Sequence, residues 1–296
     1  MRAQAPSAPP GPTTLAHEED RHQSFLIYQH FYYLKIAAAA VLISIILYLI
    51  QAPAGQRYGG TLIGYFLGTV GALTILWLLW FGMRKRSYAS NQGKLEAWLS
   101  AHVYFGIALV FIATLHTGFH FGWNIHTVAY GLMCLVIASG AYGVFCYVHY
   151  PQLMTENRRG TTMPQMLSRI AALNDELRSG AMTLDDRTAR LVRRATEVTE
   201  IGGNWWRQIT GRHPDCTTAL ALAGVDAMAA DAAPEHQVAM RQIRILLDEK
   251  AQLLNRARRD IRFKAMMDMW LIFHVPISFA LLAALLAHVV SIFFYW

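Results

Sequence analysis

Residues 269–296, MWLIFHVPISFALLAALLAHVVSIFFYW, contain no Lys, Arg, Asp or Glu. A helix needs about 20 mostly apolar residues to cross the hydrocarbon core of a bilayer, and this stretch is long enough. Four more largely uncharged stretches precede it, at about 31–51, 61–83, 97–121 and 126–150. Over the whole chain 15% of the residues are charged, against about 25% in a soluble domain. We therefore predict an all-α integral membrane bundle of five transmembrane helices.

Basic residues fall almost entirely on one side of these spans. Arg57 is the single Lys or Arg between the first two spans, whereas the other side holds clusters at 84–94, 158–159 and 256–264. Because cytoplasmic loops are enriched in Lys and Arg, we expect a cytoplasmic N-terminus, a periplasmic C-terminus and a place in the bacterial inner membrane. The formal charge of +7 then reflects topology, so no nucleic-acid partner is expected, and membrane lipid is the surrounding medium.

Two regions lie outside the predicted membrane helices. Residues 1–30 are rich in Pro and Ala and are expected to form a disordered cytoplasmic tail. Residues 151–268, with 18 Lys/Arg and 15 Asp/Glu, are expected to form a helical cytoplasmic insert between residues 31–150 and 269–296. Helix starts are predicted at Thr162-Met163-Pro164 and at Thr183 followed by two aspartates, and a helix from Pro234 is expected to run into the last span. The insert is either a hairpin packed on itself or a docking surface for a soluble partner, and the two are compatible.

Two histidine pairs stand out in the membrane segments. His102 and His116 lie 14 residues apart in the third span, and His274 and His288 lie 14 residues apart in the fifth. At 3.6 residues and 5.4 Å per turn, the members of each pair share a helix face and lie about 21 Å apart. The two spans run in the same direction, so His102 matches His274 in depth and His116 matches His288. This pattern predicts two bis-histidine iron porphyrins stacked across the bilayer, against the alternative of four unrelated intramembrane histidines.

Other residues near these histidines are secondary. His120 follows His116 by four residues but has no counterpart in the fifth span, so we expect it at a haem edge or an interface. His126 lies at a span end and is expected to be interfacial. Gly64, Gly68 and Gly71 share a face of the second span, which is typical of close helix approach and would also leave room for a porphyrin.

The paired H-x13-H pattern, with one helix between the two that contain it, resembles the di-haem cytochrome b proteins. The nearest shape is the ferric-reductase-like transmembrane group, and the respiratory and photosynthetic cytochromes b use the same ligation. The resemblance covers the second to fifth spans and implies that His102, His116, His274 and His288 are axial ligands to two haems b. The flavin and NADPH domain of the ferric reductases and the Pro-Glu-Trp-Tyr motif of quinol-oxidising cytochromes b are absent.

The expected function is therefore electron transfer across the membrane by a cytochrome subunit of a larger oxidoreductase, such as a respiratory chain complex. Three scattered cysteines without a C-x-x-C exclude a local thiolate zinc or Fe–S motif and covalent c-type haem. Electrons would come from an Fe–S or flavin protein docked on the cytoplasmic side and pass to a cytochrome or a quinone, for which no residue set marks a pocket. The alternatives are a stand-alone reductase of ferric iron, oxygen or quinone, and a non-redox membrane scaffold.

Overall fold

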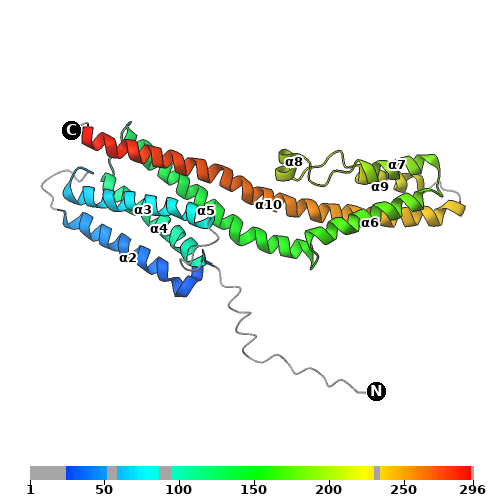
Figure 1. Ribbon diagram of the computed structural model, residues 1–296, viewed down its shortest axis with the longest axis horizontal. Coiled ribbons are helices and arrows are strands. Elements are labelled where there is room, and N and C mark those ends of the chain that lie inside the picture. The colour runs from blue at the N-terminus through cyan, green and yellow to red at the C-terminus, as the bar shows by residue number, and fades with distance from the viewer. Residues whose placement is uncertain (1–24, 52–58, 87–94, 230–233, 295–296) are drawn as a thin grey trace, which may run out of the picture. The chain divides into compact units, whose positions relative to one another are not determined.

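The computed structural model describes residues 25–51, 59–86, 95–229 and 234–294, and these residues form helices and no strands (Figure 1). Five of the helices are long and apolar enough to cross a membrane, which indicates a multi-pass membrane protein. The chain divides into two compact units. Unit 1 comprises residues 1–142 and 273–296, and unit 2 comprises residues 143–272.

Unit 1 is built from apolar helices. They are α2 (Tyr28–Ile50, after the short 3-10 helix η2, Phe25–Ile27), α3 (Leu62–Arg86), α4 (Leu95–Thr117), the first part of α5 (Ile125–Arg158) and the last part of α10 (Pro234–Phe294). Helix α4 packs against both α2 and α3. The core joins four helices through Ile75, Leu109, Met133, Leu281 and Leu285.

The outer surface of these helices is also apolar. Leu42, Leu73, Phe279 and Phe294 are all more than half exposed, with exposed fractions of 58%, 62%, 63% and 78%. In water such a surface would be costly, whereas a bilayer solvates it. The apolar exterior and the uncharged sequence therefore agree on a lipid-facing bundle.

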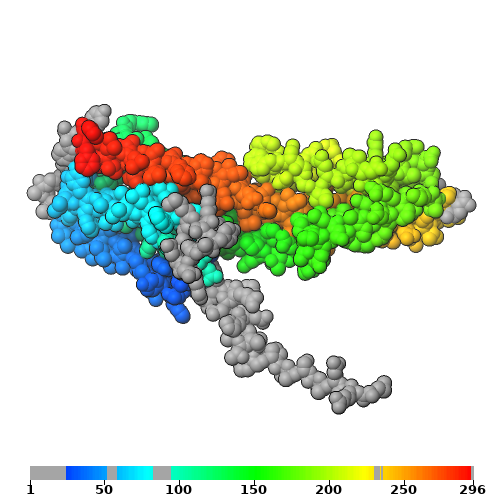
Figure 2. All heavy atoms as spheres, viewed as in Figure 1, coloured from blue at the N-terminus to red at the C-terminus, as the bar shows by residue number. Residues whose placement is uncertain are grey.

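Unit 2 is a helical assembly around the first part of α10. Helices α6 (Met163–Ala181), α7 (Asp186–Glu197) and α9 (Thr217–Ala229) lie alongside it, and α8 (Trp205–Thr210) is a short additional helix (Figures 1 and 2). Their buried core includes Leu177 from α6, Val192 from α7, Val225 from α9 and Leu247 from α10. The insert therefore does pack on itself, as the first of the two interpretations predicted.

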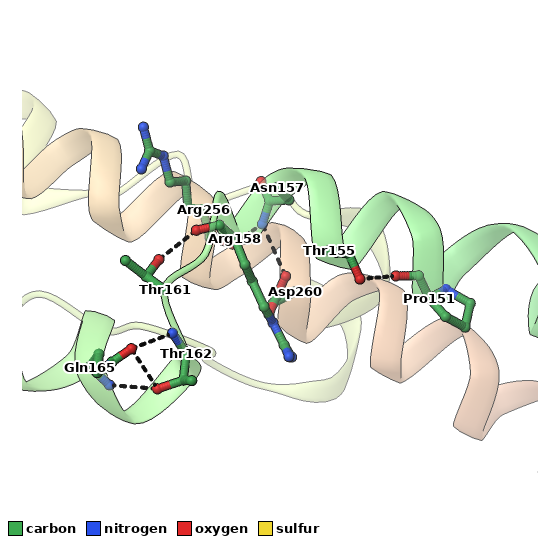
Figure 3. Close-up of polar contacts among 9 residues, drawn as sticks. All are labelled: Pro151, Thr155, Asn157, Arg158, Thr161, Thr162, Gln165, Arg256 and Asp260. Atoms are coloured by element: carbon green, nitrogen blue, oxygen red, sulfur yellow. Dashed lines mark hydrogen bonds and ion pairs between the residues drawn. The ribbon is translucent and has the colours of Figure 1, made fainter. Parts of the chain in front are cut away.

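Polar contacts fix the start of α6 and the pairing of α5 with α10 (Figure 3). The Thr162 side chain accepts a hydrogen bond from the Gln165 backbone N–H, and the Gln165 side chain accepts one from the Thr162 backbone. This capping box satisfies two otherwise free donors of the helix. Farther along, the buried Asp260 carboxylate accepts from Asn157 Nδ2 at 3.0 Å and pairs with Arg158. These bonds join the last turn of α5 to α10 within unit 2.

Several predicted boundaries are confirmed and others are wrong. The start at Thr162 and the continuous helix from Pro234 into the last span are confirmed. The third span ends at Thr117 rather than 121, because Gly118 and Phe119 adopt left-handed backbone angles (φ 59° and 63°) that stop the helix. The start expected at Thr183 is at Asp185, whose carboxylate accepts from the Arg187 and Thr188 N–H groups.

Two further expectations meet the structure only in part. Of the expected disordered tail, residues 1–24 lie outside the described residues. Residues 25–27 form η2 and α2 begins at Tyr28, but Gln29 and His30 have left-handed backbone angles (φ 45° and 56°) that kink the chain there. The fourth span was expected to end near residue 150, but α5 continues through Pro151 to Arg158. The missing proline N–H removes one helical hydrogen bond, and the helix continues around it.

Candidate functional site

The four predicted histidines all lie in unit 1, on two helices. Helix α4 holds His102 and His116, and α10 holds His274 and His288. The rings of His116 and His288 are in an edge-on contact, with centroids 6.1 Å apart and planes at 83°. His102 and His274 lie within electrostatic range of each other. The fold thus brings His116 and His288 into contact and places His102 and His274 near enough for their charges to interact.

The separation of His116 and His288 matches what two imidazoles need to share one metal ion. A metal–nitrogen bond is about 2 Å, and each nitrogen lies about 1.1 Å from its ring centre, so two axial imidazoles have centres roughly 6 Å apart. Planes near a right angle are compatible with two axial ligands, because each ring is free to rotate about its metal–nitrogen bond. The observed separation of 6.1 Å between the ring centres is therefore of the size that two imidazoles sharing one metal ion would need.

Hydrogen bonds set the tautomer of His116. Its Nδ1 lies 2.7 Å from the backbone oxygen of Gly64. A carbonyl oxygen only accepts, so Nδ1 must be the protonated nitrogen. The lone pair is then on Nε2, which is the nitrogen left for a metal, and the carbonyl orients the ring as the outer-shell partner of a metal-bound histidine does.

The same reasoning applies to His274, by one more step. The Ser139 hydroxyl donates its one hydrogen to the Val136 backbone oxygen at 2.7 Å, and it also lies 2.7 Å from His274 Nδ1. Because that hydrogen is already used, Ser139 Oγ accepts from Nδ1–H of His274. His274 is therefore also held in the tautomer that leaves the Nε2 lone pair free.

His102 is held differently. Its Nδ1 is buried and has no hydrogen bond of good geometry among the described residues, but the Leu78 backbone lies close enough to act as a hydrogen-bond partner of the ring. The ring packs against Phe81, with centroids 4.9 Å apart. Buried polar atoms rarely stay unsatisfied in a folded protein, so the Leu78 backbone is the group that would hold the orientation of this ring.

Glycines create the space that the His116 ring occupies. A Cβ at Gly68 would lie 2.6 Å from Cε1 of His116, and one at Gly59 would lie 3.2 Å from the same atom. On the other side of the bundle, a Cβ at Gly140 would lie 3.6 Å from Cε1 of His274. Gly68 of α3 and Gly59 just before α3 therefore leave the space that the His116 ring fills, in addition to any role in the close approach of helices.

The structure adds one histidine to this region and removes another from it. His126, at the start of α5, contacts His288 through their Nδ1 atoms, with ring centroids 4.5 Å apart. Sequence spacing did not indicate this contact, because the two residues are 162 positions apart. His120 lies beyond the end of α4 and its Nδ1 bonds the Gly118 backbone oxygen at 2.8 Å, so it does not continue the face that holds His116.

Metal sites of other kinds find no support in the described part of the chain, where no group of three or more His, Cys, Asp or Glu is arranged to hold a metal ion. A bis-histidine porphyrin needs only two protein ligands for each iron, so this finding bears on ordinary metal sites alone. Comparisons with protein-family models, with curated proteins and with solved structures found no match. The geometry of the histidines is therefore the main guide to function.

Proposed function

We propose that this protein is a di-haem b-type cytochrome that transfers electrons across a membrane. The ligand pairs would be His102 with His274 and His116 with His288. When bound, each bis-histidine haem supplies reversible one-electron chemistry at an iron without an open coordination position. About 21 Å of helix separates the ligands along each span, so the edges of the two porphyrins would be closer than that.

The protein's own residues have three tasks in this proposal. Gly64 and Ser139 hold His116 and His274 in the tautomer whose Nε2 lone pair would be available to an iron. The apolar core around Leu109 and Leu281 lies on the same helices, α4 and α10, and would limit the access of water to them. Small residues such as Gly68 make room for the histidine rings.

We also propose five membrane crossings in a bacterial inner membrane, with the N-terminus and unit 2 on the cytoplasmic side. The Lys and Arg distribution around the spans supports this orientation. Unit 2 would then provide the surface on which a separate redox protein delivers electrons. A cytochrome or a quinone would receive them, so the chain acts as one subunit of a larger oxidoreductase.

The proposal rests chiefly on the contact between His116 and His288, whose ring centres are 6.1 Å apart. The same two helices hold His102 and His274, each 14 residues before the histidine of that contact. Single alanine substitutions test the pairing. His116→Ala and His288→Ala should remove the same haem, and the double variant should lose no more than either single one. His102→Ala and His274→Ala should both remove the other haem.

His120→Ala is the matched control, since it lies four residues from His116 but outside the site. It should keep both haems. Optical spectra and redox titration of the purified protein identify which haem each variant retains. Loss of different haems from His116→Ala and His288→Ala would contradict the pairing.

A further inference from the structure

Unit 2 contains a pocket of about 470 Å³ that is separate from the histidine pairs. One wall is the face of α10 from Ala251 to Arg262, and the other is the segment from Gly211, at the end of α8, to Ala219, in the first turn of α9. Pockets for small ligands in proteins usually measure about 300–1,000 Å³. The pocket is thus large enough for a small molecule or a headgroup.

The charge of this pocket is strongly positive. Arg258, Arg259 and Arg262 line it together with His213, and no Asp or Glu is among its lining residues. The carboxylates of the neighbouring segment, Glu200 and Asp215, are both paired with Arg207 instead. Within the described ranges no carboxylate forms an ion pair with the three pocket arginines, so their charges are available to a ligand.

Backbone oxygens fix two of these guanidinium groups without neutralising them. Arg258 donates to the oxygens of Glu200 and Ile201, at 2.6 and 3.2 Å. Arg262 donates to the oxygen of Ile209 at 3.1 Å. A guanidinium that is already oriented loses less side-chain entropy when it binds an anion.

The positive charge of the pocket also affects the pKa of a cysteine that lines it, Cys216. Arg258 Nη1 lies 3.3 Å from Cys216 Sγ. Burial acts to raise the pKa of the Cys216 thiol, but the hydrogen bond and charge of Arg258, with backbone hydrogen bonds, outweigh it and lower the pKa overall. The pKa of His213 is lowered by burial and by the charges of Arg258 and Arg207. The lowered pKa of Cys216 agrees with the positive charge that Arg258 brings to the pocket.

We propose that this pocket binds a phosphate group, which Arg258, Arg259 and Arg262 hold by charge-assisted hydrogen bonds. Arginine matches phosphate through paired N–H donors, and three of them around one cavity suit a group with more than one charge. The phosphate could come from a soluble compound or from an anionic lipid. In the proposed topology Arg262 lies seven residues, about 10 Å of helix, before the membrane segment that starts at Met269, which puts a lipid headgroup within reach.

The experiment uses the full-length protein and follows alkylation of Cys216 by iodoacetamide, with peptide mass spectrometry to distinguish it from Cys134 and Cys146. In the first arm, protein in uncharged detergent is titrated with inorganic tripolyphosphate. In the second arm, protein in phosphatidylglycerol nanodiscs is compared with protein in phosphatidylcholine nanodiscs, without added phosphate. A ligand in the pocket should slow the alkylation of Cys216 at least several-fold.

Three variants make the outcome specific. The double variant Arg259→Gln, Arg262→Gln should lose the protection, while Arg241→Gln, an exposed arginine on the same helix outside the pocket, should keep it. Ala219→Trp fills the pocket without changing its charge and should also lose protection. Protection in the first arm identifies a soluble phosphate, and protection in the second identifies a lipid headgroup. No protection in either arm, or equal protection in all variants, would overturn the proposal.

Discussion

Replacing Gly68 by alanine should remove His116 from its place in the site. The new Cβ would lie 2.6 Å from Cε1 and 2.9 Å from Nδ1 of the His116 ring. Because ordinary carbon contacts are about 3.5–4.0 Å, the ring would have to retreat by about 1 Å. The Nδ1–oxygen distance to Gly64, now 2.7 Å, would then exceed the limit of a hydrogen bond, about 3.5 Å at most.

The size of the effect follows from three contributions. Overpacking costs about 1–3 kcal/mol, and the lost hydrogen bond costs about 1 kcal/mol. Alanine is favoured over glycine in a helix by about 1 kcal/mol, which offsets part of the cost. The net loss of about 1–3 kcal/mol corresponds to a factor of about 5 to 150 in the population with His116 correctly placed.

The assay is haem content per chain by pyridine haemochrome, together with a redox titration. Gly68→Ala should lose most of the haem assigned to His116 and His288 and keep the other. Gly71→Ala is the control, one turn along the same helix, where the new Cβ meets only Leu109 Cδ1 at 3.7 Å. Full haem content and unchanged potentials in Gly68→Ala would refute the reasoning.

Three more substitutions test other parts of the structure. Ser139→Ala removes the hydroxyl that accepts from Nδ1–H of His274, and it should weaken haem binding at the pair His102 and His274 by about 10–100-fold. Haem titration into the apoprotein measures this affinity, and Ser139→Thr should restore it. Gly143→Ala places a Cβ 2.2 Å from the Trp270 ring and should lower stability by about 1–3 kcal/mol, seen as a lower Tm in detergent. Burial lowers the pKa of Lys250 from 10.5 to about 8. Between these two pH values the unfolded chain binds more protons than the folded one, so the free energy of unfolding should rise with pH across this window by up to about 3 kcal/mol. Lys250→Met should flatten the rise.

Each of these tests has a control and an outcome that counts against it. Gly131→Ala, on the same helix as Gly143 but with nothing within 4 Å of the new Cβ, should leave Tm unchanged. A Tm equal to wild type in Gly143→Ala would show that the Trp270 ring does not pack there. A pH dependence that persists in Lys250→Met would assign the rise to other groups. Failure of Ser139→Thr to restore binding would mean that the hydroxyl is not the acceptor.

The sequence predicted the long elements well because each is determined locally. An uncharged run of about 20 residues leaves few alternatives to a spanning helix, and Thr162 followed by Pro164 is a strong local start signal. The register of His102 and His116 on one face follows from helix geometry alone, and so does that of His274 and His288. The contact of His116 on α4 with His288 on α10 therefore agrees with the pairing that the spacing predicted.

Features that depend on tertiary contacts could not be predicted in this way. The contact of His126 with His288 joins residues 162 positions apart, and no periodicity connects them. The end of α4 depends on the backbone angles of Gly118 and Phe119, and an apolar phenylalanine in a hydrophobic run gives no sign of a left-handed conformation. The role of Gly68 against His116 likewise appears only when α3 and α4 are packed together.

The measurement that tests the central claim most directly is the haem stoichiometry of the purified wild-type chain. An air-oxidised and a dithionite-reduced spectrum would be recorded, with pyridine haemochrome quantitation against protein. The account predicts two b-type haems per chain, one for each proposed histidine pair. A single haem would show that one pair is wrongly assigned, and a well-folded protein without haem would contradict the proposed electron-transfer function altogether.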